Sequence, residues 1–188
     1  MPLVLAAAAC SGAAAADPAG PGQSSGTPTC RAAELHGLFR GFRAAGGSLT
    51  AAVVLTTTRS APCTLTGTPP SVTLLDQNGG PVQVKSHALA VPENAGTVQL
   101  VPGVAMPAYG SPPASGSAWF VVTWSNWCTD ALPAVSSLLV VLPGGGSVVA
   151  QPDPTVPSWA TAPSAPRCDD SRAGSTVAIE RFQAPAVR

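Results

Sequence analysis

The chain has 188 residues, with nine basic and nine acidic side chains, so its formal net charge is zero and only 10% of its residues are charged. Lys85 is the single lysine, and without a basic stripe the chain is not expected to bind nucleic acid. The 21 prolines and 19 glycines indicate many turns. Val, Thr and Ser, rather than the helix formers Glu and Lys, fill the periodic segments, which favours an all-β domain.

The N-terminus is an apolar run that ends at Cys10 and is followed by Ser-Gly. At ten residues it is too short to cross a bilayer, which needs about 20 apolar residues. Small residues precede the cysteine, as at the end of a bacterial lipoprotein signal peptide, although Ala7 stands where leucine is usual and no basic residue comes before Cys10. We therefore predict that residues 1–10 are a lipoprotein signal remnant and that Cys10 is the lipidation site. An ordinary secretory signal or a disordered head is the alternative.

Residues 11–29 contain no large apolar side chain and cannot offset their own ordering entropy, so they are expected to form a flexible linker. The remainder, residues 30–188, has the length of a single domain.

Four cysteines remain after Cys10, and an even number in an exported chain indicates disulfides with three possible pairings. No spacing of the CxxC or CxxH kind occurs, which argues against zinc. Pairing between sequence neighbours is favoured, giving Cys30–Cys63 and Cys128–Cys168. Each would close a loop of a few dozen residues and contribute about 4 kcal/mol in the chain-entropy model.

The first element of the domain, residues 31–43, is ambiguous. Its large apolar residues fit helical spacing, but Gly37 and Gly41 weaken a helix, so an edge strand is favoured. Residues 49–57 alternate clearly and predict a strand with Leu49, Ala51, Val53 and Leu55 on one face.

An Asn-Gly turn at residues 78–79 predicts a tight hairpin between strands at 71–76 and 81–85, the second with Val82 and Val84 inward. Alternation or apolar runs predict further strands, which are residues 97–101, 117–128, 136–142, 147–150 and 175–182. Residues 102–116 and 151–167 are Pro-rich connections.

The stretch at residues 117–128 holds three of the four tryptophans and is predicted to be an inner strand. Phe120, Val122 and Trp124 are expected in the core, with Trp119, Val121 and Thr123 on the other face. Seven to nine short strands with frequent turn signals predict an all-β fold, an antiparallel β-sandwich of immunoglobulin-like architecture.

No hydrolase elbow, zincin motif, P-loop or dinucleotide fingerprint occurs, so no catalytic residue and no cofactor is predicted. A minimal hydrolase site around His36 or His87 remains an alternative. Metal binding by His36, His87, Met106 or Asp130 is disfavoured because these ligands do not cluster in the sequence. Asp169 and Asp170 are expected to be turn residues rather than a cation site.

The tryptophans could line a ligand-binding face, but Trp124 is better explained by packing near a disulfide. Trp127 follows a polar dipeptide at the end of its strand, and Trp159 lies in a Pro-rich connection. These two are the expected exposed aromatics and possible ligand contacts. The loops 102–116 and 151–167 are the expected contact surfaces, because loops on a rigid sandwich commonly carry recognition.

The segments Cys-Arg-Ala-Ala-Glu-Leu at residues 30–35, Pro-Cys-Thr-Leu-Thr-Gly at 62–67 and Trp-Ser-Asn-Trp-Cys at 124–128 carry a family resemblance. They resemble the actinobacterial family called domain of unknown function 4232, over about residues 30–184. Thr57 stands for the family's usual Asn and Thr68 for its usual aromatic, as in a divergent member. The resemblance implies a secreted protein or lipoprotein and no established activity, so no catalytic residues can be carried over.

Together these features predict an exported, lipid-anchored module on the outer side of the cytoplasmic membrane. Its expected role is non-enzymatic binding of a cell-envelope protein or glycan, with the membrane reached through Cys10. An extracellular hydrolase with a histidine-based site is the alternative.

Overall fold

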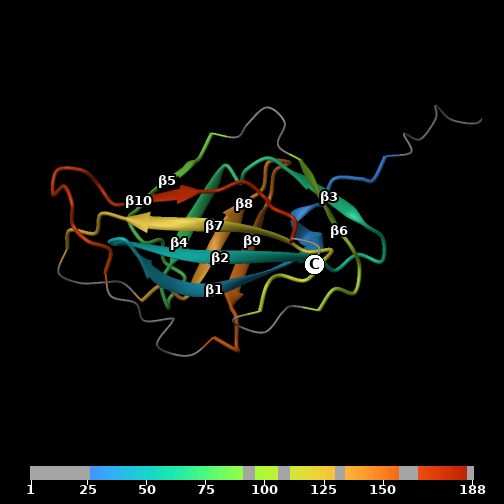
Figure 1. Cartoon of the computed structure of the whole chain (residues 1–188), viewed down its shortest axis with the longest axis horizontal. Helices are drawn as coiled ribbons and strands as arrows, with labels where there is room; N and C mark the ends of the chain where they lie inside the picture. The colour runs from blue at the N-terminus through green and yellow to red at the C-terminus, as the bar shows by residue number, and fades with distance from the viewer. Residues whose placement is uncertain (1–25, 91–95, 106–110, 130–133, 157–164, 186–188) are drawn as a thin grey trace, which may run out of the picture.

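The computed structural model describes residues 26–90, 96–105, 111–129, 134–156 and 165–185 (Figure 1). No α-helix occurs among these residues. They form one 3₁₀ turn and ten strands: η1 (Ala32–Glu34), β1 (Leu35–Ala45), β2 (Ser48–Thr57), β3 (Cys63–Thr66), β4 (Ser71–Leu75), β5 (Lys85–Ala88), β6 (Thr97–Leu100), β7 (Ala118–Ser125), β8 (Ser137–Val141), β9 (Ser147–Pro152) and β10 (Thr176–Ile179).

Eight strands form one sheet in the order β4-β8-β9-β1-β2-β7-β10-β5, and β3 pairs with β6 in a second, two-stranded sheet. Figure 1 shows β4, β8 and β9 crossing behind β1, β2, β7 and β10, so the large sheet folds over itself into two layers. The predicted all-β sandwich class is confirmed. Most ladders are antiparallel, but β1 pairs with β9 and β10 pairs with β5 in parallel, which alternation alone did not reveal.

The core lies between these layers. The predicted inner residues of β7, Phe120, Val122 and Trp124, are all fully buried, and β7 is an inner strand between β2 and β10. The predicted inward face of β2 is also buried, from Leu49 to Leu55. Strict alternation therefore placed these side chains correctly.

Residues 31–43 form a strand only from Leu35 onward, after the short turn η1, and the strand runs on to Ala45. The prediction of an edge strand was wrong, because β1 lies between β9 and β2 in the middle of the sheet. Gly37 lets β1 lie close to β9. A Cβ at Gly37 would lie 3.1 Å from the Cα of Ala150 on β9, so a side chain here would force the two closely spaced backbones to shift apart by a few tenths of an ångström.

The predicted hairpin at residues 71–85 is only partly correct. The Asn-Gly turn forms, with Gly79 at φ 77° and the Asp76 carboxylate accepting the N–H groups of Asn78 and Gly80, each at 2.8 Å. The returning chain pairs with β4 at a single bridge between Pro81 and Leu75. The Val84 N–H then donates to the Val82 carbonyl, a three-residue turn that diverts the chain into β5 beside β10.

Both predicted disulfides are present. The Cys30–Cys63 bond spans 33 residues and is buried, whereas the Cys128–Cys168 bond spans 40 residues and is exposed. The first joins the chain just before η1 to the start of β3, and the second lies beyond the end of β7, toward the opposite end of the molecule in Figure 1. Each disulfide therefore cross-links the chain at one end of the fold.

The last residues of the predicted linker contact the domain. Thr29 forms a β-bridge with Thr64, and the Thr64 N–H donates to the Pro28 carbonyl at 2.9 Å. The last residues of the predicted linker are thus attached to β3. Among the described residues there is no helix long and apolar enough to span a membrane.

Candidate binding groove on the outer face of the sheet

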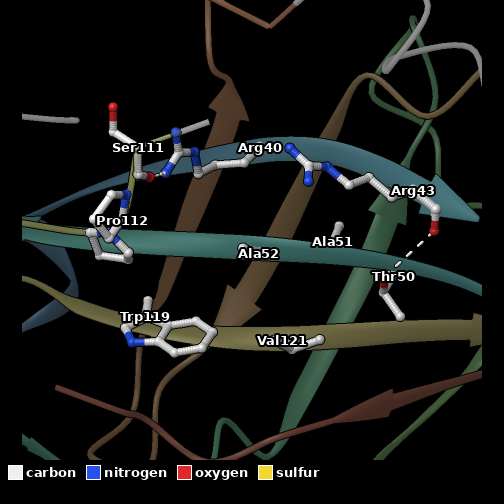
Figure 2. Close-up of a pocket in the computed structure, with 10 residues that line it drawn as sticks. Arg40, Arg43, Thr50, Ala51, Ala52, Ser111, Pro112, Trp119 and Val121 are labelled. Carbon is white, nitrogen blue, oxygen red and sulfur yellow. Dashed lines mark hydrogen bonds between the residues drawn. The ribbon is translucent and has the colours of Figure 1, made fainter. Parts of the chain in front are cut away.

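A β-bulge in β1 brings two arginines onto one face of the sheet. Phe39 is opposite Val53 of β2, but Phe42 is opposite Ala51, so three positions on β1 match two on β2. Gly41 absorbs the extra residue with φ 72°. As a result Phe39 and Phe42 both point inward, with ring centroids 5.2 Å apart, and Arg40 and Arg43 both lie on the outer side (Figure 2).

Arg40 is a buried arginine held from two sides. Its Nε lies 3.6 Å from Oδ2 of Asp153, and its Nη1 donates to the carbonyl of Ser111 at 2.7 Å. Asp153 is itself fixed, because its Oδ1 accepts from the backbone N–H and the hydroxyl of Thr155. Arg40 therefore attaches the segment that begins at Ser111 to the outer face of the sheet, and its charge is offset by Asp153.

These elements enclose a groove of about 460 Å³, which we call the arginine groove. Small or apolar residues of β2 and β7 form its floor: Thr50, Ala51, Ala52 and Val121. Figure 2 shows Arg40 and Arg43 along β1 on one side, and Trp119 of β7 at the end near Pro112. Ser111 and Pro113 complete the lining.

The groove has features of a ligand site. Its volume falls in the range of about 300–1,000 Å³ that is usual for small-molecule sites. Its two charged lining residues are both arginines, and an arginine guanidinium suits planar anions such as carboxylates. No acid, histidine or cysteine is among its described lining residues, which offer an anion and an apolar ring a place to bind.

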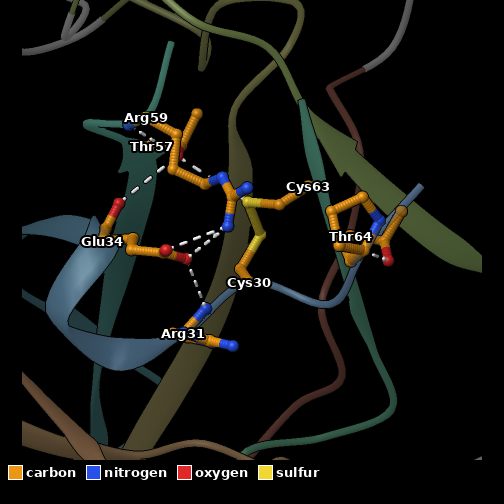
Figure 3. A network of polar contacts seen from close by, with 8 residues as sticks. Cys30, Arg31, Glu34, Thr57, Arg59, Cys63 and Thr64 are labelled. Carbon is orange, nitrogen blue, oxygen red and sulfur yellow. Dashed lines mark hydrogen bonds and ion pairs between the residues drawn. A yellow bond between two sulfur atoms is a disulfide. The ribbon is translucent and has the colours of Figure 1, made fainter. Parts of the chain in front are cut away.

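A second polar cluster lies beside the buried disulfide (Figure 3). One nitrogen of Arg59, Nη1, donates to both carboxylate oxygens of Glu34 at 2.9 Å, and Oε2 also accepts the Arg31 N–H at 3.2 Å. The hydrogen bond from Arg59 is the main reason that the pKa of Glu34 lies below its usual value; desolvation opposes it, and the donated Arg31 N–H adds to the lowering. The carbonyl of Glu34 accepts from Thr57 and Thr58, so this cluster ties η1 to the end of β2.

The two histidines of the hydrolase alternative are both exposed and lie on different strands. His36 is on β1 and His87 on β5, on opposite sides of the strand pair β2 and β7 in the sheet. Within the described part of the chain neither imidazole makes a hydrogen bond, and neither lines the arginine groove. Among the residues that the structure describes, no Ser, Thr or Asp is therefore placed to act with either histidine, and we do not propose the hydrolase alternative.

The predicted ligand contact Trp127 is half-buried rather than exposed. Its ring packs edge-on against Trp124, with centroids 5.3 Å apart, so part of its surface serves the core. The other predicted sites lie outside the described residues, which are Cys10, Met106, Asp130 and Trp159. Ligand contact by either tryptophan stays a prediction.

Asp169 and Asp170 take part in turn structure, as predicted. Asp169 pairs with Arg167, and the Asp170 carboxylate accepts the Arg172 N–H at 2.8 Å. Among the described residues no three His, Cys, Asp or Glu side chains cluster as a metal site would require.

Sequence reasoning missed the arginine groove. Arg40 and Arg43 are three positions apart, which strict strand alternation would place on opposite faces. The available signal was the helix-like spacing of Phe39 and Phe42 around Gly41, because a glycine within a strand pattern often marks a bulge. Trp119 was assigned correctly to the outer face of its strand, where it now lines the groove.

Comparisons of the chain with models of known protein families, with curated proteins and with solved structures found no match. The resemblance to domain of unknown function 4232 therefore stays a prediction from the sequence motifs.

Proposed function

We propose that this protein is an exported, non-enzymatic binding module of the cell envelope, anchored to the membrane through Cys10, and that the arginine groove holds its ligand. The observation that carries the proposal is the placement of two arginines and a tryptophan around an apolar floor on the central strands of the sheet. Binding groups on rigid strands are positioned more precisely than groups on loops.

The internal support of the groove also favours binding. Arg40 is held by Asp153 and attaches Ser111 at 2.7 Å, so that one wall is fixed before a ligand arrives. A site that is ordered in advance loses less conformational entropy when the ligand binds. The two Pro residues beside Ser111 restrict that wall further.

The two disulfides indicate folding in an oxidising, extracytoplasmic environment. Anchoring is the finer part of the proposal and rests on the apolar run that ends at Cys10. The domain begins near Pro28, so a linker of residues 11–27 would lie between the lipid and the fold. Such a length of flexible chain lets the groove reach partners some distance from the membrane.

The anchor is tested by expressing the full chain in a bacterial host fed radiolabelled palmitate. Labelling of the wild type and its loss in Cys10→Ser support lipidation, with both proteins required to reach the outer side of the membrane. An unlabelled wild type that is freely soluble after export contradicts it.

The groove is tested with the full chain carrying Cys10→Ser, incubated with washed cell-envelope fractions. We expect Arg43→Gln to reduce retention on the envelope by about tenfold, the effect of losing one charge-assisted pair. Arg172→Gln removes the same charge from an exposed turn away from the groove and should leave retention unchanged. Equal retention of all three proteins would rule out the groove as the binding site.

A further inference from the structure

We propose that a second pocket, where the N-terminal segment joins the domain, binds a phosphodiester anion, either of a lipid headgroup or of a soluble phosphodiester. The pocket has a volume of about 840 Å³ and shares no lining residue with the arginine groove. Its walls are residues 28–32, Glu34, Arg59 and the glycine turn at residues 144–146. We call it the linker-end pocket.

The walls of the linker-end pocket are held in place by backbone contacts. The Cys30 N–H donates to the Thr64 carbonyl at 2.9 Å, and Cys30 is also fixed by its disulfide. The turn between β8 and β9 packs closely against η1, because a Cβ at Gly146 would lie 2.9 Å from the Cβ of Ala32. The pocket is therefore shaped before a ligand arrives, which lowers the entropy cost of binding.

The lining side chains carry a net positive charge. Two arginines and one glutamate line the pocket, so the formal charge of its described residues is +1. The Glu34 carboxylate is occupied by Nη1 of Arg59, at 2.9 Å from each oxygen (Figure 3). Arg31 is exposed, and its guanidinium forms no ion pair with a described residue. One net charge suits a monoanionic phosphodiester better than a phosphate monoester, which carries nearly two negative charges.

The glycine turn adds backbone donors to the same pocket. Gly145 and Gly146 have φ of 89° and 74°, and successive glycines in such a turn form the concave backbone that binds phosphate oxygens elsewhere. The Gly145 N–H donates to the Leu142 carbonyl, whereas those of Gly144 and Gly146 donate to no acceptor within the described chain. Donors on one wall and a guanidinium on another suit the several oxygens of a tetrahedral anion.

The position of the pocket favours a lipid as the source of the phosphodiester, and this step alone rests on the proposed anchor. With a lipid at Cys10, residues 11–27 would connect the membrane to the wall that begins at Pro28. A flexible chain of that length spans roughly 20–25 Å. Headgroups would then be present at a high effective concentration, so that even a weak site would be occupied.

The probe is dimethyl phosphate, a monoanionic diester, titrated into the isotope-labelled full chain carrying Cys10→Ser and followed by NMR. The matched probes are trimethyl phosphate, which has the same shape without charge, and acetate, a planar monoanion. We expect dimethyl phosphate to bind at least about tenfold more tightly than either. The largest amide shifts should fall at Gly144 and Gly146.

Variants locate the binding to the linker-end pocket. Arg31→Gln should weaken the binding of dimethyl phosphate by about tenfold, because it removes the exposed cation. Arg172→Gln removes the same charge from an exposed turn that does not line the pocket, and it should bind as the parent does. Circular dichroism confirms that both variants are folded.

Two further arms distinguish the sources of the phosphodiester. The same chain is sedimented with phosphatidylcholine vesicles that contain or lack phosphatidylglycerol, and it is titrated with soluble glycerophosphoglycerol. Sedimentation that requires both phosphatidylglycerol and Arg31 assigns the ligand to a lipid. Binding of glycerophosphoglycerol without such sedimentation assigns it to a soluble phosphodiester.

The inference is overturned if trimethyl phosphate or acetate binds as tightly as dimethyl phosphate. It is also overturned if Arg31→Gln binds as the parent does, or if the amide shifts lie away from the glycine turn. These measurements use neither a lipidated chain nor envelope fractions, so their failure leaves the proposed function standing. Loss of palmitate labelling and of envelope retention, with diester binding intact, would refute the proposed function alone.

Discussion

The side-chain amide of Asn126 makes two hydrogen bonds to the backbone of Asp170. Its Nδ2 donates to the Asp170 carbonyl at 2.9 Å, and its Oδ1 accepts the Asp170 N–H at 2.9 Å. The same amide also donates to the carbonyl of Ala173 and accepts the N–H of Asp169. Asn126 has φ 60°, a conformation that asparagine tolerates better than most residues. It thus joins the end of β7 to the loop beyond Cys168.

Asn126→Asp should destabilise the fold by about 1–3 kcal/mol. A carboxylate accepts the two N–H groups but cannot donate, so it would face the carbonyl oxygens of Asp170 and Ala173. Urea unfolding measures the effect. Gln99→Glu, an amide-to-carboxylate change on an exposed strand position, is the control and should change stability by less than about 0.5 kcal/mol. Equal effects of the two changes would show that the hydrogen bonds of the Asn126 amide do not stabilise the fold.

The two disulfides should differ in their access to reductant. Cys128 and Cys168 are both exposed, whereas Cys63 is 0% and Cys30 is 4% exposed. Under native conditions dithiothreitol should therefore open the Cys128–Cys168 bond first, and mass spectrometry of alkylated peptides should find label at these two residues. Early label at Cys30 or Cys63 would contradict this order.

Removing the exposed disulfide should lower the free energy of unfolding even though the bond lies at the surface. The Cys128–Cys168 bond spans 40 residues, and the double change Cys128→Ser with Cys168→Ser should cost about 4 kcal/mol in the chain-entropy model. The measurement is urea unfolding of the variant beside the oxidised parent. A loss below about 1 kcal/mol would mean that the unfolded chain gains little freedom when the bond is absent.

The sequence predicted the fold best where alternation is strict and local. Phe120, Val122 and Trp124 were expected in the core and are fully buried, because each neighbour on a regular strand points to the opposite face. The disulfide pairing followed from cysteine count and spacing. Prediction failed where long-range pairing decides the structure. The central position of β1 and the parallel partner of β5 depend on strands more than a hundred and about ninety residues away, respectively, which local patterns do not encode.

The groove could not be predicted for a related reason. Its arginines share a face only because of the bulge at Gly41, and its wall is held by a contact from Arg40 to Ser111 across 71 residues of sequence. Trp119 alone was placed on the correct face. A single outer-face tryptophan does not define a ligand site until the residues opposite it are known.

Replacement by phenylalanine should cost much more stability at Trp124 than at Trp119. The Trp124 Nε1 donates to the Ser175 hydroxyl at 2.7 Å inside the core. The Trp119 Nε1 is buried and has no hydrogen-bond acceptor among the described residues. We expect Trp124→Phe to cost about 2–4 kcal/mol through the lost hydrogen bond and the cavity. Trp119→Phe should stay within about 0.5 kcal/mol of the parent, because it removes an unsatisfied donor. Thermal unfolding of the two variants measures the difference, and a larger loss in Trp119→Phe would contradict it.

The ion pair between Glu34 and Arg59 should make the free energy of unfolding depend on pH in the acidic range. The lowered pKa of Glu34 means that the folded state holds the ionised form more strongly than the unfolded state does. Its contribution is therefore present above the usual value of 4.5 and is lost as the pH falls through the lowered, folded-state pKa. Glu34→Gln should show a smaller loss of unfolding free energy between about pH 5 and pH 3 than the parent. Identical pH profiles for Glu34→Gln and the parent would refute the assignment.

Gly37 should tolerate an added side chain poorly. An added Cβ would lie 3.1 Å from the Cα and 3.2 Å from the Cβ of Ala150, and 3.3 Å from Cδ2 of Leu55. Gly37→Ala should therefore destabilise the protein by about 1–3 kcal/mol, as overpacking of a core does. Gly96→Ala, where no atom lies within 4 Å of the added Cβ, is the control and should be neutral or slightly stabilising. Urea unfolding compares them.

Adding Ala150→Gly to Gly37→Ala separates the two sources of the clash. This second change removes the Ala150 Cβ but leaves its Cα, which lies closer to the added methyl group. Since backbone can move only if the parallel pairing of β1 and β9 shifts, we expect the double variant to recover only part of the lost stability. Full recovery would place the conflict in the side chain of Ala150 alone, and the close approach of the two backbones would then not be the reason that β1 carries glycine at this position.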